Sequence, residues 1–189
     1  MKRVMLAGML SIIIIITTAC GQSFYRYNYP VQPFDYTNQD DQRVSLSDLE
    51  GKVWIADLVF TYCETICPTM SANMAELQKR LKSEGVEVEL ISFSVDPERD
   101  DPAALKQYLE KFDADFSNWN ALTGYEFHEI KSFVLRSFKT TIGKDTASDQ
   151  VIHDANFNLV DQSGHVVAKY DGMNPPYTKI IKKVKDLQK

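Results

Sequence analysis

Runs of apolar residues divide most of this chain into strands and helices. The run VWIADLVF at residues 53–60 is almost entirely apolar and rich in β-formers, which predicts a strand buried on both faces. Residues 86–95 alternate and then become apolar, which predicts a second strand, and residues 119–122 predict a short third one. Two hairpins are predicted where strand-like segments flank turn residues, at 34–46 around Asn38-Gln39-Asp40-Asp41 and at 156–170 around Asp161-Gln162-Ser163-Gly164.

Helical spacing marks the segments between these strands. Behind Pro68, apolar residues recur every three or four positions, which predicts a helix that ends at Gly85. Met70 and Met74 lie on its apolar face, so we expect them in the core and not as metal ligands. Further helices are predicted at residues 101–112, 125–139 and 176–188, and residues 142–150 are polar and predict a loop.

The order of these elements predicts the fold class. Helices alternate with strands through the middle of the chain, and a hairpin ends the sheet before the last helix. Alternation of this kind is typical of α/β proteins with a largely parallel sheet. We therefore predict a thioredoxin-like three-layer sandwich with an added N-terminal β-hairpin, in one domain covering residues 34–189, without internal repeats.

The first twenty residues have the pattern of an export signal. Lys2 and Arg3 precede an uncharged apolar run at residues 4–16, which is shorter than the roughly 20 residues of a membrane span. Small residues then lead to Cys20, as at a bacterial lipoprotein cleavage site, although Thr17 stands where leucine is commonest. We predict a signal peptide at 1–19, lipidation of Cys20, and a tether at 20–33; an uncleaved anchor is the alternative.

This interpretation places the domain on the extracytoplasmic face of the cell membrane. The net charge of the domain then excludes some classes of partner. The chain has 189 residues, with 21 Lys and Arg against 26 Asp and Glu, for a net charge of −5. Removal of Lys2 and Arg3 with the signal leaves 19 minus 26, or −7. An acidic domain without a basic cluster is a poor candidate for binding nucleic acid.

The cysteines carry the first chemical indication. If Cys20 is lipidated, only Cys63 and Cys67 remain of three. A disulfide between them would enclose three residues and would restrict the unfolded chain very little. Both lie between a strand and a helix N-terminus, whose field favours thiolate, so we expect lowered pKa values for both. Spacing alone leaves a disulfide, electron exchange and metal binding open.

Histidine is the natural third ligand for two thiolates, because sulfur donors with an imidazole suit copper or zinc. Three histidines are available. His128 lies on a predicted helix and His165 follows a hairpin turn, so we expect both to be exposed. His153 stands between the polar loop and the last hairpin, from where it could reach the cysteines, although an ordinary loop histidine would occupy the same position.

Three stretches of the sequence together resemble the Sco/SenC family, copper-binding assembly factors for cytochrome oxidase. The chain is most similar to the bacterial, lipid-anchored members over residues 30–189. The stretches are DLVFTYCETICP at 57–68, SVDPERDDP at 94–102 and HDANFNLVDQSG at 153–164. The resemblance implies a thioredoxin-like fold and one copper ion, Cu(I) or Cu(II), per chain. It also implies that Cys63, Cys67 and His153 are the copper ligands.

The function implied by the resemblance is that of a copper chaperone, for which we expect no enzymatic activity, although its cysteine pair could exchange disulfides. Its partner would be the copper-site subunit of cytochrome c oxidase, where copper enters a dinuclear centre. The alternative is a thiol-disulfide oxidoreductase in which Cys63 and Cys67 are the redox-active pair and reduce the cysteines of that site. The sequence has no CxxC motif and no Trp before the first cysteine, which argues against a general reductase. It also lacks the Pro/Thr pattern expected before the reactive cysteine of a peroxiredoxin, which argues against a peroxidase.

Asp96 is the remaining candidate site residue. It follows the second central strand and is therefore expected at the same edge of the sheet as the cysteines. From there it could orient a metal ligand without binding the ion. The alternative is a turn residue that precedes Pro97.

Overall fold

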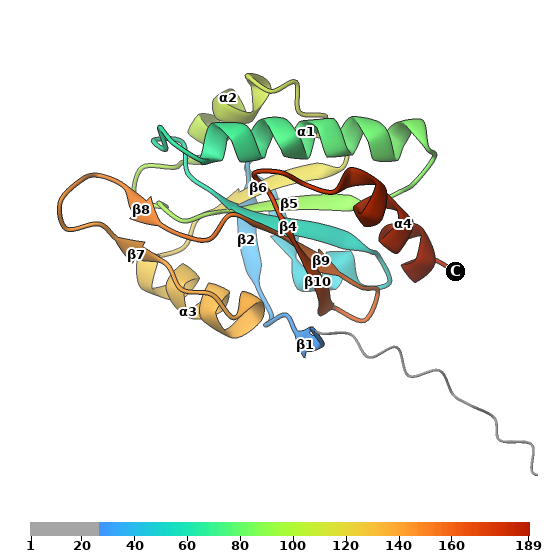
Figure 1. Ribbon diagram of the computed structural model, residues 1–189. Coiled ribbons are helices and arrows are strands. Elements are labelled where there is room, and N and C mark those ends of the chain that lie inside the picture. Colours follow the sequence, from blue (N-terminus) through green and yellow to red (C-terminus); the bar gives the residue numbers. More distant parts are fainter. Residues whose placement is uncertain (1–26) are drawn as a thin grey trace, which may run out of the picture.

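The computed structural model describes residues 27–189, and its centre is one eight-stranded sheet (Figure 1). The strand order is β1-β10-β9-β4-β5-β6-β2-β3, in which β4, β5 and β6 are parallel and their neighbours antiparallel. The strands are β1 (Tyr29–Pro30), β2 (Asp35–Asn38), β3 (Arg43–Ser45), β4 (Trp54–Val59), β5 (Glu89–Ser94), β6 (Trp119–Thr123), β9 (Asn156–Val160) and β10 (His165–Asp171).

Helices cover both faces of this sheet, which gives three layers (Figure 1). The helices are α1 (Cys67–Ser83), α2 (Pro102–Glu110), α3 (Phe127–Phe138) and α4 (Tyr177–Leu187), with a short 3-10 helix at Leu46–Leu49. Hydrogen bonds join α1 to α2 and to α4, so these three lie on one face, and α3 covers the other. The predicted thioredoxin-like sandwich is confirmed, and the added hairpin β2–β3 extends the sheet beside β6.

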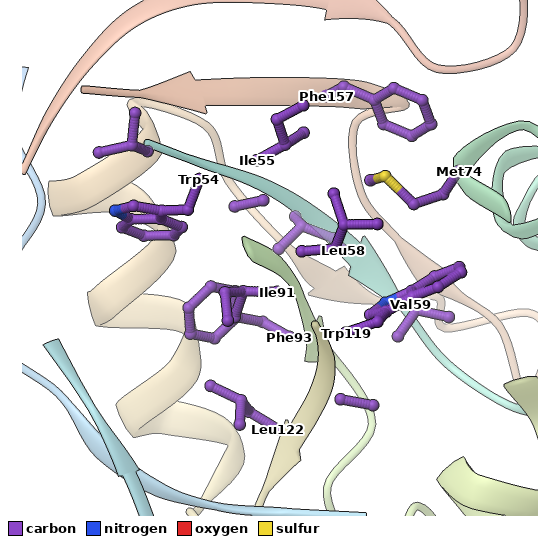
Figure 2. Packing of buried hydrophobic residues seen from close by; sticks show 14 of the residues in the cluster. Trp54, Ile55, Leu58, Val59, Met74, Ile91, Phe93, Trp119, Leu122 and Phe157 are labelled. Carbon is purple, nitrogen blue, oxygen red and sulfur yellow. The ribbon is translucent and has the colours of Figure 1, made fainter. Parts of the chain in front are cut away.

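Large side chains fill the space between the layers. Figure 2 shows them on both sides of the central strands. Trp54 and Phe93 belong to an aromatic cluster that includes Phe133 of α3, whereas Met70 and Met74 are completely buried on α1. Both methionines are core residues, as predicted. Full burial of such side chains contributes roughly 1.5–3 kcal/mol each, and this rigid core fixes the strand ends that carry the site.

Local signals explain where the helices begin and end. Pro68 occupies the first turn of α1, where its missing N–H costs no hydrogen bond. Gly85 follows the helix at a positive φ of 64°, which glycine adopts without strain. The Asp101 carboxylate accepts a hydrogen bond from the Ala104 N–H at 2.7 Å and caps α2. None of the helices in the described residues is long and apolar enough to cross a membrane.

Two segments differ from the sequence expectations. Tyr29–Pro30, in the predicted tether, pairs with β10, and Val31 is buried. Proline suggested a linker there, yet an edge strand tolerates it. The predicted polar loop contains a second sheet, the β7–β8 hairpin (Gly143–Lys144 and Val151–Ile152), whose strands are too short to leave a pattern. The signal peptide at 1–19 and Cys20 lie outside the described residues.

Candidate metal centre

The two cysteines lie at the carboxyl end of β4, where it leads into α1. Cys63 occupies a turn in which its N–H donates to the Phe60 carbonyl at 3.3 Å, and Cys67 is the first residue of the helix. The Cys67 N–H donates to the Cys63 sulfur at 3.3 Å. The pair is therefore not helical, and Cys63 receives the free N–H and the positive end of the helix dipole. Both cysteines are free and buried.

His153 completes a compact set of three donors. Its Nε2 lies 3.4 Å from the Cys67 sulfur, and the potential ligand atoms of Cys63, Cys67 and His153 all lie within 4.8 Å of one another. The other ring nitrogen, Nδ1, lies 2.7 Å from the Asp154 carbonyl, to which it can only donate. In the neutral ring this leaves the Nε2 lone pair directed at the cysteines, as in a metal-ligating histidine.

Neighbouring side chains keep this histidine in place and partly shielded. The Phe60 ring contacts the His153 ring edge to face, with centroids 5.7 Å apart. Cys67 is completely buried, Cys63 is 6% exposed, and His153 is half-buried, so an ion held there would be open on the His153 side. The other histidines lie elsewhere: His128 is exposed on α3, as expected, and His165 is half-buried and contacts Ser163 in the β9–β10 turn.

The two thiols have opposite acidities. A hydrogen bond from Cys67 lowers the pKa of Cys63 far below that of a free thiol, against the opposing effect of burial, with help from His153 and the Cys67 N–H. The same hydrogen bond, then burial and the Cys63 charge, raise the pKa of Cys67. The expectation that both pKa values are lowered is wrong, because the two sulfurs share one proton. Cys63 is the thiolate at neutral pH.

This asymmetry predicts the pH dependence of alkylation in the reduced, metal-free protein. Cys63 is expected to react with iodoacetamide at a rate that changes little between pH 6 and 8. A free thiol with a pKa near 8.5 would slow about tenfold per pH unit below it. Mass spectrometry of the modified peptide measures the rate. In Cys67→Ala the rate should fall more steeply as the pH falls, because the hydrogen bond from the Cys67 thiol is lost while the N–H of residue 67 and His153 remain. The same pH dependence in the parent and in Cys67→Ala would refute the shared proton.

A buried carboxyl lies beneath the site on β4. Asp57 is 1% exposed, and burial raises its pKa to about 7, although it accepts a hydrogen bond from Ser92 at 2.6 Å. Trp119 Nε1 donates in turn to the Ser92 hydroxyl at 2.9 Å. The charge of Asp57 also raises the pKa of Cys67. Asp57 therefore favours the state in which Cys67 keeps its proton while Cys63 is a thiolate.

Asp57 is expected to make stability depend on pH. The unfolded chain loses this proton near pH 4 and the folded chain near pH 7, so stability falls as pH rises through that window. Asp57→Asn should remove this dependence and raise the free energy of unfolding at pH 8 by on the order of 4 kcal/mol relative to the parent. Urea unfolding of the parent and of Asp57→Asn at pH 4.5 and 8 measures this difference in stability. If the two proteins differed by the same amount at both pH values, the raised pKa of Asp57 would be contradicted.

Asp100 holds the cysteine loop, and the sequence analysis missed it. Its carboxylate accepts hydrogen bonds from the Thr61 N–H at 3.1 Å, the Thr61 hydroxyl at 2.6 Å and the Ser94 hydroxyl at 2.6 Å. It is completely buried, and burial raises its pKa. The stretch SVDPERDDP contains four acidic residues, and only the contacts distinguish this one from its neighbours.

Asp96 is buried beside Asp100 but does not bond to a candidate ligand among the described contacts. Its carboxylate accepts a hydrogen bond from Arg99 Nε at 2.5 Å, and its N–H donates to the Ser94 hydroxyl at 3.1 Å. Asp96 therefore contacts Arg99 and Ser94, and not the candidate ligands themselves.

Comparison with known proteins identifies the relatives of this arrangement. The family model described as SCO1/SenC matches residues 26–189. A SCO1/SenC family lipoprotein from Bacillus anthracis is 47% identical, with a TM-score of 0.83 over 86% of this chain and 96% of that one. BsSco, described with a disulfide switch and as a member of the Sco family of cytochrome c oxidase assembly proteins, is 50% identical, with a TM-score of 0.80 over 85% and 94%.

A copper-bound structure is also among the similar proteins. ScoI from Bradyrhizobium japonicum, solved with copper bound, is 27% identical to this chain. The TM-score is 0.69, over 84% of this chain and 99% of the other. The similarity thus covers most of this chain and nearly all of the copper-bound relative.

Proposed function

Because this chain belongs to the SCO1/SenC family, we propose that it binds one copper ion through Cys63, Cys67 and His153 and delivers it to cytochrome c oxidase. The observation that carries the proposal is the convergence of two sulfurs and one imidazole nitrogen within 4.8 Å. This donor set suits copper. In support, ScoI is described with copper bound and BsSco as a cytochrome c oxidase assembly protein.

Copper in this proposal is cargo, and the protein's own residues govern its capture and release. Cys63 is already a thiolate, so only the Cys67 proton has to leave when a metal binds. His153 supplies its Nε2 from a segment outside the central sheet, and it is the most exposed of the three donors. A partner's ligands would approach from this side. The proposed recipient is the dinuclear copper centre of an oxidase subunit.

Copper titration of the reduced protein tests the proposal. The parent should bind one equivalent, and Cu(II) should give a visible sulfur-to-copper charge-transfer band that zinc cannot give. Cys63→Ser, Cys67→Ser and His153→Ala should each weaken binding, while His128→Ala, an exposed histidine on α3, should bind like the parent. Equal binding by the parent and all three site variants would refute the site.

The alternative function is thiol-disulfide exchange with the recipient subunit. The observation that favours it is the pair of free cysteines, one of them a thiolate, in a thioredoxin-like fold. BsSco is also described with a disulfide switch. Turnover of a model disulfide separates the two functions. Fast turnover that persists in His153→Ala would favour the oxidoreductase, and turnover at the rate of free thiols would favour the chaperone.

We also propose that the protein is anchored to the outer face of the cell membrane through a lipid on Cys20. The sequence around residues 1–20 supports this, and the Bacillus anthracis relative is described as a lipoprotein. Mass spectrometry of the N-terminal peptide from membranes should find a diacylglyceryl-modified Cys20. In Cys20→Ala the lipid should be absent and the protein released; an unmodified Cys20 inside an intact N-terminus would refute the proposal.

A further inference from the structure

His153 directly follows a short hairpin that lies outside the central sheet. Strands β7 and β8 pair through two residues each, and β8 ends immediately before His153. Figure 1 shows the hairpin at the same end of the molecule as the first turn of α1. A hollow of about 430 Å³ separates it from the segment after β5, with Asp149 and Gln150 on one side and Asp96 on the other.

Arg99 bridges this gap and reaches three segments. Arg99 Nε donates to the Asp96 carboxylate at 2.5 Å, and an Nη2 hydrogen of Arg99 is donated to the Asp149 carbonyl at 2.5 Å. The Arg99 guanidinium also lies over the Tyr62 ring, 4.8 Å from its centroid. A single planar group thus contacts the segment after β5, the hairpin that leads to His153, and the residue next to Cys63.

A second contact joins the hairpin directly to the cysteine loop. Gln150 Nε2 donates to the Tyr62 carbonyl at 3.2 Å. Tyr62 is 61% exposed, so its ring is positioned by these contacts and not by burial. The hairpin is also anchored by the buried Val151 and by an exposed ion pair between Lys144 and Glu98, which lies beside the same hollow. We call Tyr62, Asp96, Arg99, Asp149 and Gln150 the Arg99 cluster.

We propose that Arg99 is a positioning residue for copper binding, which fixes the His153 hairpin against the cysteine loop while Asp96 orients its guanidinium. This inference rests on the proposed copper site. Arg99 itself touches none of the three candidate ligands in the described contacts; it acts on the two segments that carry them. Mutation of residues that orient metal ligands typically changes metal affinity by 10–100-fold. An arginine that bonds two groups at once and stacks on a ring is poorly replaced by other residues.

A double-mutant cycle with His153 tests this role. Arg99→Ala should weaken copper binding about tenfold in the parent, measured by competition with a chelator. In the His153→Ala background the same change should alter affinity less than twofold, because the ligand that Arg99 positions is gone. Arg80→Ala is the matched control, since Arg80 also pairs with a carboxylate, Glu76, and lies over a ring, Tyr177, but in the last turn of α1, far along the helix from the cysteine loop.

Hydrogen exchange in the copper-free protein gives an independent readout. The Asp145 N–H donates to the Gln150 carbonyl across the hairpin at 2.9 Å. In Arg99→Ala this amide should exchange about tenfold faster, whereas the Val95 amide, bonded to Val59 between central strands, should keep its rate. A general loss of stability would accelerate both.

The outcomes separate this inference from the proposed function. If His153→Ala weakens copper binding but Arg99→Ala does not, Arg99 has no positioning role while the copper site stands. An equal loss from Arg99→Ala in both backgrounds would also overturn the inference, because the effect would not pass through His153. If the parent and His153→Ala bind copper equally, the proposed site itself is wrong.

Discussion

Cys67→Ser is expected to weaken copper binding roughly a thousandfold. A four-ligand metal site in a small domain binds with about 10–16 kcal/mol, or roughly 3–4 kcal/mol per ligand, and about 4 kcal/mol is a thousandfold. Cys67 is completely buried at the start of α1 and contacts both other donors, so no other side chain can replace its sulfur. Competition with a chelator of known affinity measures the loss.

Serine is the appropriate replacement because it keeps the size and hydrogen-bonding capacity of cysteine in a buried position. The far-ultraviolet circular dichroism of Cys67→Ser should therefore match that of the parent. His165→Ala serves as the control, since this histidine contacts Ser163 in the β9–β10 turn. A loss of less than tenfold in a folded Cys67→Ser protein would remove Cys67 from the ligand set.

Asp100→Ala is expected to cost about 3–5 kcal/mol of unfolding free energy. The substitution leaves three donors in a buried site without an acceptor: the Thr61 N–H, the Thr61 hydroxyl and the Ser94 hydroxyl. Each unsatisfied buried group costs roughly 1–3 kcal/mol. Since Thr61 begins the cysteine loop, the loop should also lose its fixed position. Urea unfolding measures the stability.

The neighbouring residue gives a matched control for this prediction. Asp101 is exposed and caps α2 through one hydrogen bond to the Ala104 N–H. Its replacement by alanine should cost only about 1 kcal/mol. If Asp100→Ala were no more destabilising than Asp101→Ala, the buried carboxylate would not be the anchor of the loop.

The fold was largely predictable because its central elements have long, regular patterns. The apolar run of β4 and the helical spacing of α1 extend over several residues each, and the turn residues of both hairpins have specific backbone preferences. The β7–β8 hairpin was not predictable in this way. Its strands, Gly143–Lys144 and Val151–Ile152, contain two residues each, too few to show an alternating pattern, so only its contacts with the domain define it.

The site was predictable in part. The spacing of Cys63 and Cys67 before a helix indicated reactive sulfurs, but the unequal sharing of their proton depends on the hydrogen bond between them and then on burial, which spacing does not reveal. From its position in the chain alone, His153 could be a metal ligand or an ordinary loop residue. The resemblance to the family favoured the ligand. Asp100 and Arg99 act through contacts between segments roughly 40–50 positions apart, such as that between Arg99 and Asp149, which no local pattern encodes.

X-ray absorption spectroscopy of the copper-loaded protein tests the central claim most directly, because it identifies the atoms bound to copper. The parent should show two sulfur neighbours and the outer-shell scattering of an imidazole. Cys67→Ser should lose one sulfur, and His153→Ala should lose the imidazole signal while keeping both sulfurs. An unchanged spectrum in His153→Ala, or a parent spectrum without sulfur, would contradict a copper site made of Cys63, Cys67 and His153.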